Sequence, residues 1–406
     1  MLYNTYSLSN GLRLVHLPCE SPVAYCGFAI NVGSRDEDQD SFGMAHFVEH
    51  MLFKGTKKRR STHILNRMET VGGELNAYTT KEETFIYSVF LEPHFERAFE
   101  LLSDLVFHSS FPEQETKKEL EVILDEINSY EDNPAELIYD EFENLLYEGQ
   151  QLGHHILGTP ESINRFTHKQ GLDFVRQHYL SDNIVFFSMG KTPFKKIVRL
   201  AEAFIGKEPQ KPHIQHRLQP ACIAAKRIGC TKNTNQAHVM IGGRAYNLQD
   251  KRRVGLHLIN NILGGPGMNS RLNISLREKR GLVYQIDSSI TSYSDTGIFS
   301  IYFGSEKQEA ERCIQLTLKE LKKFRDKALT TLQLARAKKQ LIGQLGVATD
   351  HRESTFLRLG KSFLHHNHFD SLPDICAQIE SLSSGCLWDI CNEVFDEGGI
   401  SLLKYE

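Results

Sequence analysis

The stretch GMAHFVEHMLFKGT, from Gly43 to Thr56, sets two histidines and one glutamate into a pattern that otherwise predicts an amphipathic helix. The apolar positions recur at helical spacing and would form one stripe facing a core: Ala45, Val48, Met51 and Leu52. Asp40 or Ser41 would cap the start of this helix, and Gly55 suits its end. The stretch therefore predicts a helix that packs on a core and carries three polar residues that this packing does not need.

This helix and the strand-like run before it both occur twice in the chain. CGFAINVG, residues 26–33, precedes the first helix, and AHVMIGGRAY, residues 237–246, precedes a similar helical stretch that starts 212 positions after Gly43, near Gly255. A second pair of strand-like runs repeats at an offset of 213: FIYSVF, residues 85–90, and IFSIYF, residues 298–303. Two helical stretches follow in each half: 92–106 and 112–130, then 305–324 and 332–347.

A polar, proline-bearing and aperiodic segment at residues 206–220 separates the two halves and is typical of a linker. The repeat therefore predicts two homologous domains, residues 1–205 and residues 221–406. Strands and helices do not alternate strictly along either half. We therefore expect an α+β fold in which each domain has a mixed, largely antiparallel sheet packed with helices.

The three polar residues are present in only one copy of the repeated helix. At the repeat offset the second copy has apolar or uncharged residues in their place: Leu258 for His46, Asn261 for Glu49 and Ile262 for His50. Because the second copy is expected to fold without the three residues at these positions, the polar residues of the first copy point to chemistry rather than to packing.

His46 and His50 are four positions apart, so both imidazoles project from one face of the helix and are suited to bind a single Zn²⁺. Glu49 lies beside them, and His-x-x-Glu-His is the inverted form of a zinc-peptidase signature in which the glutamate acts as general base. A catalytic zinc needs a third protein ligand. The stretch 112–130 offers Glu119 and Glu126 on one helix face. Their spacing alone does not select either, and both also fit solvated carboxylates.

The net charge of −4 over 406 residues gives the chain no general attraction to nucleic acid or to acidic membranes, and we expect neither as a partner. The basic run KGTKKRR, from Lys54 to Arg60, is interpreted as a solvated loop after the helix. Eight scattered cysteines without a CxxC pair favour reduced thiols. The chain has no apolar run long enough to span a bilayer and no signal-peptide pattern at its start, so we expect a cytoplasmic protein.

These motifs resemble those of the pitrilysin family of zinc peptidases, which includes insulin-degrading enzyme and mitochondrial processing peptidase. In that family a ligand glutamate follows the inverted motif by 76 residues, and here that position, counted from His50, is Glu126. A supporting glutamate seven residues earlier matches Glu119. The resemblance covers nearly the whole chain, including the second copy without the motif. It implies one Zn²⁺ per chain, Glu119 orienting the site, Glu49 as general base, and three metal ligands: His46, His50 and Glu126.

The resemblance also assigns residues to the substrate. GGELNAYTTKEETFIY is similar to the family's edge strand, where a peptide adds as an extra β-strand, and Asn76 and Ala77 match its peptide-contacting positions. Without the resemblance this segment would be an ordinary hairpin with Gly72-Gly73 as its turn. SLREKRGLVYQ resembles the segment whose arginine and tyrosine reach the substrate and the developing oxyanion, here Arg277 and Tyr284. The residues alone would make it a charged helix end.

The resemblance implies a zinc-dependent endopeptidase that cleaves short or unfolded peptides, or presequences. Larger relatives close four such domains around a chamber. This chain has two, so we expect a homodimer or a heterodimer with a related subunit. Two alternatives stay open. One is a non-catalytic or partner-dependent scaffold subunit of the same fold, which the intact set of metal-site residues disfavours. The other is a structural zinc protein, which would need a fourth protein ligand.

Overall fold

A computed structural model describes residues 3–208, 216–232 and 234–406, and the chain divides into two compact units. Each unit is assembled from three segments. Unit 1 consists of Met1–Asn128, His154–Arg217 and Thr349–Phe369. Unit 2 consists of Ser129–Gly153, Leu218–Ala348 and Asp370–Glu406. Of the linker predicted at 206–220, residues 209–215 lie outside the described residues. The chain passes between the units several times, so each unit contains segments from both halves of the sequence.

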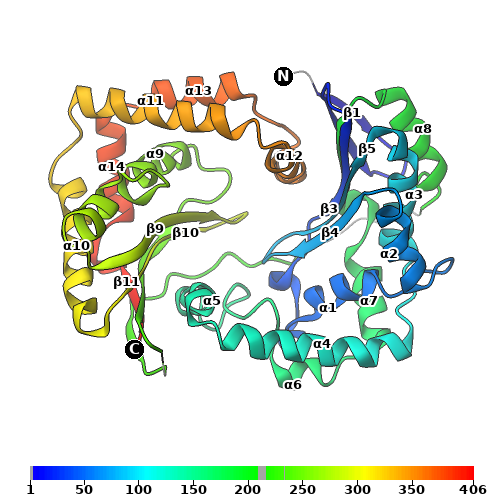
Figure 1. Cartoon of the computed structure of the whole chain (residues 1–406), viewed down its shortest axis with the longest axis horizontal. Coiled ribbons are helices and arrows are strands. Elements are labelled where there is room, and N and C mark those ends of the chain that lie inside the picture. Colours follow the sequence, from blue (N-terminus) through cyan, green and yellow to red (C-terminus); the bar gives the residue numbers. More distant parts are fainter. Residues whose placement is uncertain (1–2, 209–215, 233) are drawn as a thin grey trace. The chain divides into compact units, whose positions relative to one another are not determined.

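Unit 1 is built on a six-stranded sheet in the order β1, β2, β6, β3, β5 and β4 (Figure 1). The strands are β1 Asn4–Ser7, β2 Arg13–Pro18, β3 Val23–Ile30, β4 Glu74–Thr79, β5 Thr84–Leu91 and β6 Ile184–Gly190. β2 and β6 run parallel, and the other neighbouring pairs are antiparallel. β4 and β5 form a hairpin through residues 80–83. Gly72-Gly73 lie before β4, so the alternative in which they form the hairpin turn is wrong.

Unit 2 is built on a five-stranded sheet in the order β7, β11, β8, β10 and β9. The strands are β7 Arg227–Cys230, β8 Ala237–Ala245, β9 Val283–Ser292, β10 Gly297–Ser305 and β11 Ser401–Tyr405. β7 and β11 run parallel, and the other pairs are antiparallel. Both sheets are therefore mixed and largely antiparallel, which confirms the predicted α+β fold.

The helices follow the repeated order that the sequence predicts. In the first half of the chain they are α1 Met44–Leu52, α2 Ser61–Glu69, α3 Phe95–His108, α4 Glu113–Glu131, α5 Pro134–Leu146, α6 Pro160–Ile163, α7 His168–His178 and α8 Phe194–Phe204. In the second half they are α9 Arg253–Gly264, α10 Ala310–Asp326, α11 Thr331–Ala348, α12 Arg352–His366, α13 Leu372–Ser381 and α14 Ser384–Val394. The predicted strand pairs correspond to β3 with β8 and to β5 with β10.

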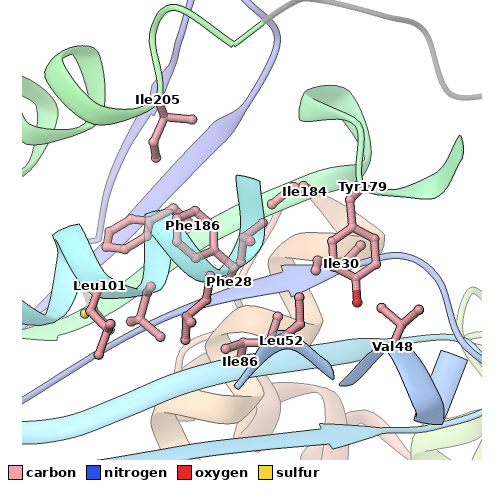
Figure 2. Close-up of a cluster of buried hydrophobic side chains, with 14 of the residues drawn as sticks. Phe28, Ile30, Val48, Leu52, Ile86, Leu101, Tyr179, Ile184, Phe186 and Ile205 are labelled. Carbon is pink, nitrogen blue, oxygen red and sulfur yellow. The ribbon is translucent and has the colours of Figure 1, made fainter. Parts of the chain in front are cut away.

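The helix α1 packs on one face of the unit 1 sheet through its apolar stripe. Val48 and Leu52 are fully buried, and Figure 2 shows both side chains in a cluster with Phe28 of β3 and Ile86 of β5. Ala29, the next residue along β3, belongs to a second cluster on the opposite face, because side chains alternate along a strand. The core thus fixes α1 against the sheet and leaves its polar residues on another side of the helix.

The second face of each sheet is covered by a helix from the other half of the chain. The helix α12 packs on β2, β3 and β6 of unit 1 and buries Phe356, Leu359 and Phe363 there. The helix α5 packs on β8 and β11 of unit 2 and buries Ile138 and Phe142. Each half of the chain therefore contributes one helix to the core of the other unit.

Two further expectations concern the whole chain. Within the three described ranges, no helix combines the length and the apolar character that crossing a membrane requires. All eight cysteines fall inside these ranges and are free thiols, as the scattered pattern predicts.

Candidate metal centre

A buried carboxylate fixes the start of α1. Glu37 accepts hydrogen bonds from Gly43 N at 2.8 Å and from Ala45 N at 2.7 Å. Burial raises the pKa of Glu37 well above its usual value, and the two amide bonds act in the opposite direction. The expectation that Asp40 or Ser41 caps this helix is wrong, because both lie in a separate 3₁₀ turn. Glu37 is a residue that sequence reasoning missed, and it sets where the helix with the two histidines begins.

His46 and His50 of α1 meet Glu126 of α4. Glu126 Oε2 lies 3.7 Å from His46 Nε2 and 3.5 Å from His50 Nε2. One ligand atom from each of the three residues lies within 4.8 Å of the other two. The ligand atoms of a tetrahedral zinc at about 2.0–2.2 Å lie roughly 3.3–3.6 Å from one another. Two imidazoles and one carboxylate at these separations therefore fit a zinc ion with little movement.

The two imidazoles have different electrostatic surroundings. Burial, followed by the charge of His50, lowers the pKa of His46 to about 3, so the His46 ring is neutral at neutral pH. Burial also acts to lower the pKa of His50, but the hydrogen bond to Glu119 and nearby carboxylates raise it overall. His50 Nδ1 donates to Glu119 Oε1 at 2.8 Å, which directs the Nε2 lone pair toward a metal. Glu119 thus lies where a residue that orients a ligand is expected.

Glu49 precedes His50 on α1 and is held by the end of β4. Thr79 Oγ1 donates a hydrogen bond to Glu49 Oε2 at 2.6 Å. Burial raises the pKa of Glu49, while the bond from Thr79 lowers it. A carboxyl group with a raised pKa beside candidate metal ligands is suited to proton transfer. Sequence reasoning missed Thr79, although its position two residues after Ala77, on the same face of β4, was a signal that could have found it.

Asn76 and Ala77 lie in the middle of β4, which is at the edge of the sheet. Asn76 pairs with Tyr87 and Ala77 with Ile86, both on β5. Within the described residues β4 has no strand on its other side, so its backbone offers hydrogen-bonding groups to a further strand.

Arg277 and Tyr284 lie together in unit 2. Arg277 is in a π-helix, Asn273–Glu278, a rare form that is frequent at functional sites. Its guanidinium carbon lies 5.7 Å from the centre of the Tyr284 ring, and Tyr284 is 83% exposed. The other predicted site residues gather in unit 1, so the structure forms two groups of candidates, one in each unit.

The sequence profile "Insulinase (Peptidase family M16)" matches residues 18–160, and "Peptidase M16 inactive domain" matches residues 165–341. An uncharacterized zinc protease of Bacillus subtilis, YmxG, is 32% identical over 397 residues, which cover 97% of this chain and 95% of that protein. The mitochondrial-processing peptidase subunit beta of Bos taurus is 29% identical over 402 residues, which cover 96% and 81%.

Two solved structures share the fold. The structure titled as a peptidase M16 inactive domain from Pseudomonas fluorescens has a TM-score of 0.92 at 21% identity, covering 100% of this chain and 98% of that one. A protease from Helicobacter pylori has a TM-score of 0.89 at 21% identity, covering 100% and 99%.

Proposed function

Since the chain belongs to peptidase family M16, the insulinase family, we propose that it is a zinc-dependent endopeptidase. The observation that carries this proposal is the convergence of two histidines and a glutamate, with a second glutamate beside them. We assign one zinc ion per chain to His46, His50 and Glu126, which are close enough to share it. Glu49 is the general base in this assignment.

Each remaining residue then has a chemical role in peptide hydrolysis. When bound, zinc would polarise the scissile carbonyl and lower the pKa of water. Glu49 takes the proton of the attacking water at Oε1, because Thr79 already donates to Oε2, and passes the proton to the leaving amine. Arg277 and Tyr284 are the proposed hydrogen-bond donors to the developing oxyanion.

We propose that the substrate binds along β4 as an added strand. Main-chain hydrogen bonds to an edge strand accept many sequences, which favours short or unfolded peptides, or presequences, over one defined sequence. Ala77 and Thr79 are two positions apart on β4, so both side chains lie on the face that packs toward α1. Thr79 contacts Glu49. A peptide paired with β4 would therefore pass beside the general base.

We further propose that the chain works as a homodimer. In this arrangement the domain of residues 1–205 supplies the zinc ligands, and the domain of residues 221–406 supplies Arg277 and Tyr284. The alternative is a heterodimer with a related subunit, which the name of the bovine relative, a subunit beta, supports. Sedimentation of the active enzyme tests both, because a monomer that cleaves peptides at assay concentration would refute dimerisation.

The first experiment combines metal content with turnover. The purified chain is assayed for zinc per chain and for cleavage of a quenched mixed-peptide library, with and without a chelator. We expect about one zinc per chain and cleavage that the chelator abolishes. Glu49→Gln should keep the zinc and lower kcat by about 100-fold or more, because general acid–base catalysis contributes on that order. Glu121→Gln, a change at an exposed glutamate of α4, is the matched control and should be neutral.

The outcomes separate the rival functions. If Glu49→Gln kept most of the activity, the general-base assignment would be wrong. Bound zinc without cleavage would favour a subunit that needs a partner. If the purified chain bound no zinc when zinc was supplied, the non-catalytic scaffold would be the better reading.

A further inference from the structure

The loop that follows α1 is hydrogen-bonded to the end of α3 and to the connection that leads into α4. Ser110 N donates a hydrogen bond to Gly55 O at 3.1 Å, and Lys57 N donates to His108 O at 3.0 Å. Gly55 also lies so close to the α4 N-terminus that a Cβ at this position would be 3.0 Å from the Pro112 side chain. These contacts hold the loop, including Lys54, beside the first turns of α4.

Lys54 completes a chain of hydrogen bonds that ends at a candidate metal ligand. Its Nζ lies 2.6 Å from Glu119 Oε2, and Glu119 Oε1 accepts from His50 Nδ1 at 2.8 Å. The Glu119 side chain is only 6% exposed and that of Lys54 is 27% exposed. Each oxygen of this buried carboxylate therefore has its own donor, one from the ligand histidine and one from the lysine.

The interpretation of the basic run as a solvated loop is wrong for two of its members. Lys54 binds Glu119, and Arg59 binds Glu100 with a side chain that is 16% exposed. Lys57, by contrast, is exposed, as the sequence pattern predicts. Lys54 is thus distinguished from its neighbours by a specific partner, and that partner contacts His50.

We propose that Lys54 is a positioning residue that fixes the Glu119 carboxylate and, through it, the His50 ring, and so strengthens zinc binding. This inference rests on the proposed zinc site. A carboxylate held by one oxygen can turn about its terminal torsion, which is broad, whereas two anchored oxygens define its plane. Outer partners of metal-ligating histidines typically change metal affinity by about 10–100-fold when they are removed.

The positive charge of Lys54 acts against zinc binding, whereas its orientation of Glu119 favours it. Whether zinc affinity falls or rises when Lys54 is replaced therefore shows which effect is larger. An ammonium group near the site repels a dication, and its removal would tighten binding if charge were its only role. Solvent screens this repulsion, because Lys54 is partly exposed and lies beyond Glu119. We therefore expect the loss of orientation to outweigh the relief of repulsion.

The test measures the zinc dissociation constant of the full-length protein by competition with a chromophoric chelator. Lys54→Met keeps the length of the side chain and removes its charge, and it should weaken zinc binding by about 10–100-fold. Lys54→Arg keeps a donor for Oε2 and should bind within about threefold of wild type. Lys57→Met is the matched control from the same basic run and should leave the affinity unchanged.

A double-mutant cycle shows whether Lys54 acts through Glu119. In a Glu119→Gln background, Lys54→Met should change zinc affinity by less than about threefold, because the group that it fixes is already altered. Thermal unfolding of the zinc-free variants checks that each one folds. Lys54→Gln replaces Lys54→Met if that variant does not fold.

The results separate this inference from the proposed function. If wild type binds zinc tightly and Lys54→Met binds it equally well or more tightly, the positioning role is overturned and the zinc site stays intact. An effect of the same size in the Glu119→Gln background would also overturn it, because Lys54 would then act independently of Glu119. Absence of zinc binding in wild type would refute the zinc site and this inference together.

Discussion

Glu83 links the β4–β5 hairpin of unit 1 to α12, the helix that the second half of the chain contributes to this unit. It ends the turn between β4 and β5, and its side chain is 3% exposed. Glu83 Oε1 lies 2.9 Å from Lys361 Nζ and 2.6 Å from His365 Nε2, both on α12. Replacing this carboxylate by an amide, Glu83→Gln, should therefore loosen α12 with almost no change in volume.

The size of the effect follows from the pKa of Glu83. Burial acts to raise this pKa, but the hydrogen bond from His365 and the charge of Lys361 lower it from the usual 4.5 to about 2. Each pKa unit corresponds to about 1.4 kcal/mol. Because Lys361 is 45% exposed and solvent screens its charge, we discount the sum to about 2–3 kcal/mol. A depressed carboxylate pKa stabilises the fold above the unfolded-state pKa, and this contribution is lost as pH falls from about 4.5 toward 2.

Hydrogen–deuterium exchange of peptides from α12 measures this contribution locally. At pH 7, Glu83→Gln should lower the protection of these peptides by roughly 30- to 150-fold, which corresponds to 2–3 kcal/mol. At pH 3.5 the free-energy difference from wild type should shrink by about 40 per cent, after correction for intrinsic exchange rates. Glu113→Gln is the matched control, because Glu113 pairs with Lys117 on an exposed helix surface and such pairs contribute little.

Two results would refute this reasoning. Equal protection of α12 in wild type and Glu83→Gln at pH 7 would mean that the buried ion pairs do not hold this helix. A difference that stays constant down to pH 3.5 would mean that the loss has another cause than the charge of Glu83.

The remaining predictions concern packing and backbone conformation. Phe356→Ala removes a fully buried ring that stacks on Phe187 at a centroid distance of 4.3 Å. Thermal unfolding followed by circular dichroism should show that the free energy of unfolding of unit 1 falls by about 3–5 kcal/mol. A fall below about 1 kcal/mol would argue against this packing. Gly281→Ala should cost about 1–2 kcal/mol, because Gly281 has a φ of +61° and no neighbour that a Cβ would touch. Gly343→Ala, in the open middle of α11, should instead stabilise by about 0.5–1 kcal/mol. The fluorescence of Trp388, the one tryptophan of the chain, reports both changes in urea, and shifts of the same sign would contradict the backbone argument.

The elements that the sequence predicts best are those with a local signal. The apolar stripe of α1 and the apolar or aromatic runs of β3, β5, β8 and β10 are local patterns that fix element type within a few residues. The repeat strengthened each assignment, because a strand or helix seen in one half supported its counterpart. His46 and His50 were predictable for the same reason, since one helical turn is a local spacing.

The parts that escaped sequence reasoning depend on contacts between distant residues. Capping rules favour Asp40 and Ser41 over Glu37, because they consider neighbours of the helix start and not a carboxylate that folds back to it. In the sequence Lys54 is one member of a basic run, and only the fold brings Glu119 within 2.6 Å of it. The sequence also does not reveal that α5 packs on the sheet of unit 2 and α12 on the sheet of unit 1. The apolar face of a helix shows that it packs on something, but not on which sheet.

The helices α1 and α9 occupy equivalent places in the two units, but only α1 carries the polar residues of the candidate metal site. In unit 2 the equivalent helix fills the matching positions with Leu258, which is fully buried, and Ile262, which packs against that core. The helix α1 instead buries an imidazole, His46, at 7% exposure, and partly buries a carboxyl group, Glu49, whose pKa burial raises. Burying such groups opposes folding relative to apolar side chains of similar size. Because the same kind of helix packs in unit 2 without these residues, the fold does not require them, and the proposed zinc site gives their presence in α1 a chemical reason.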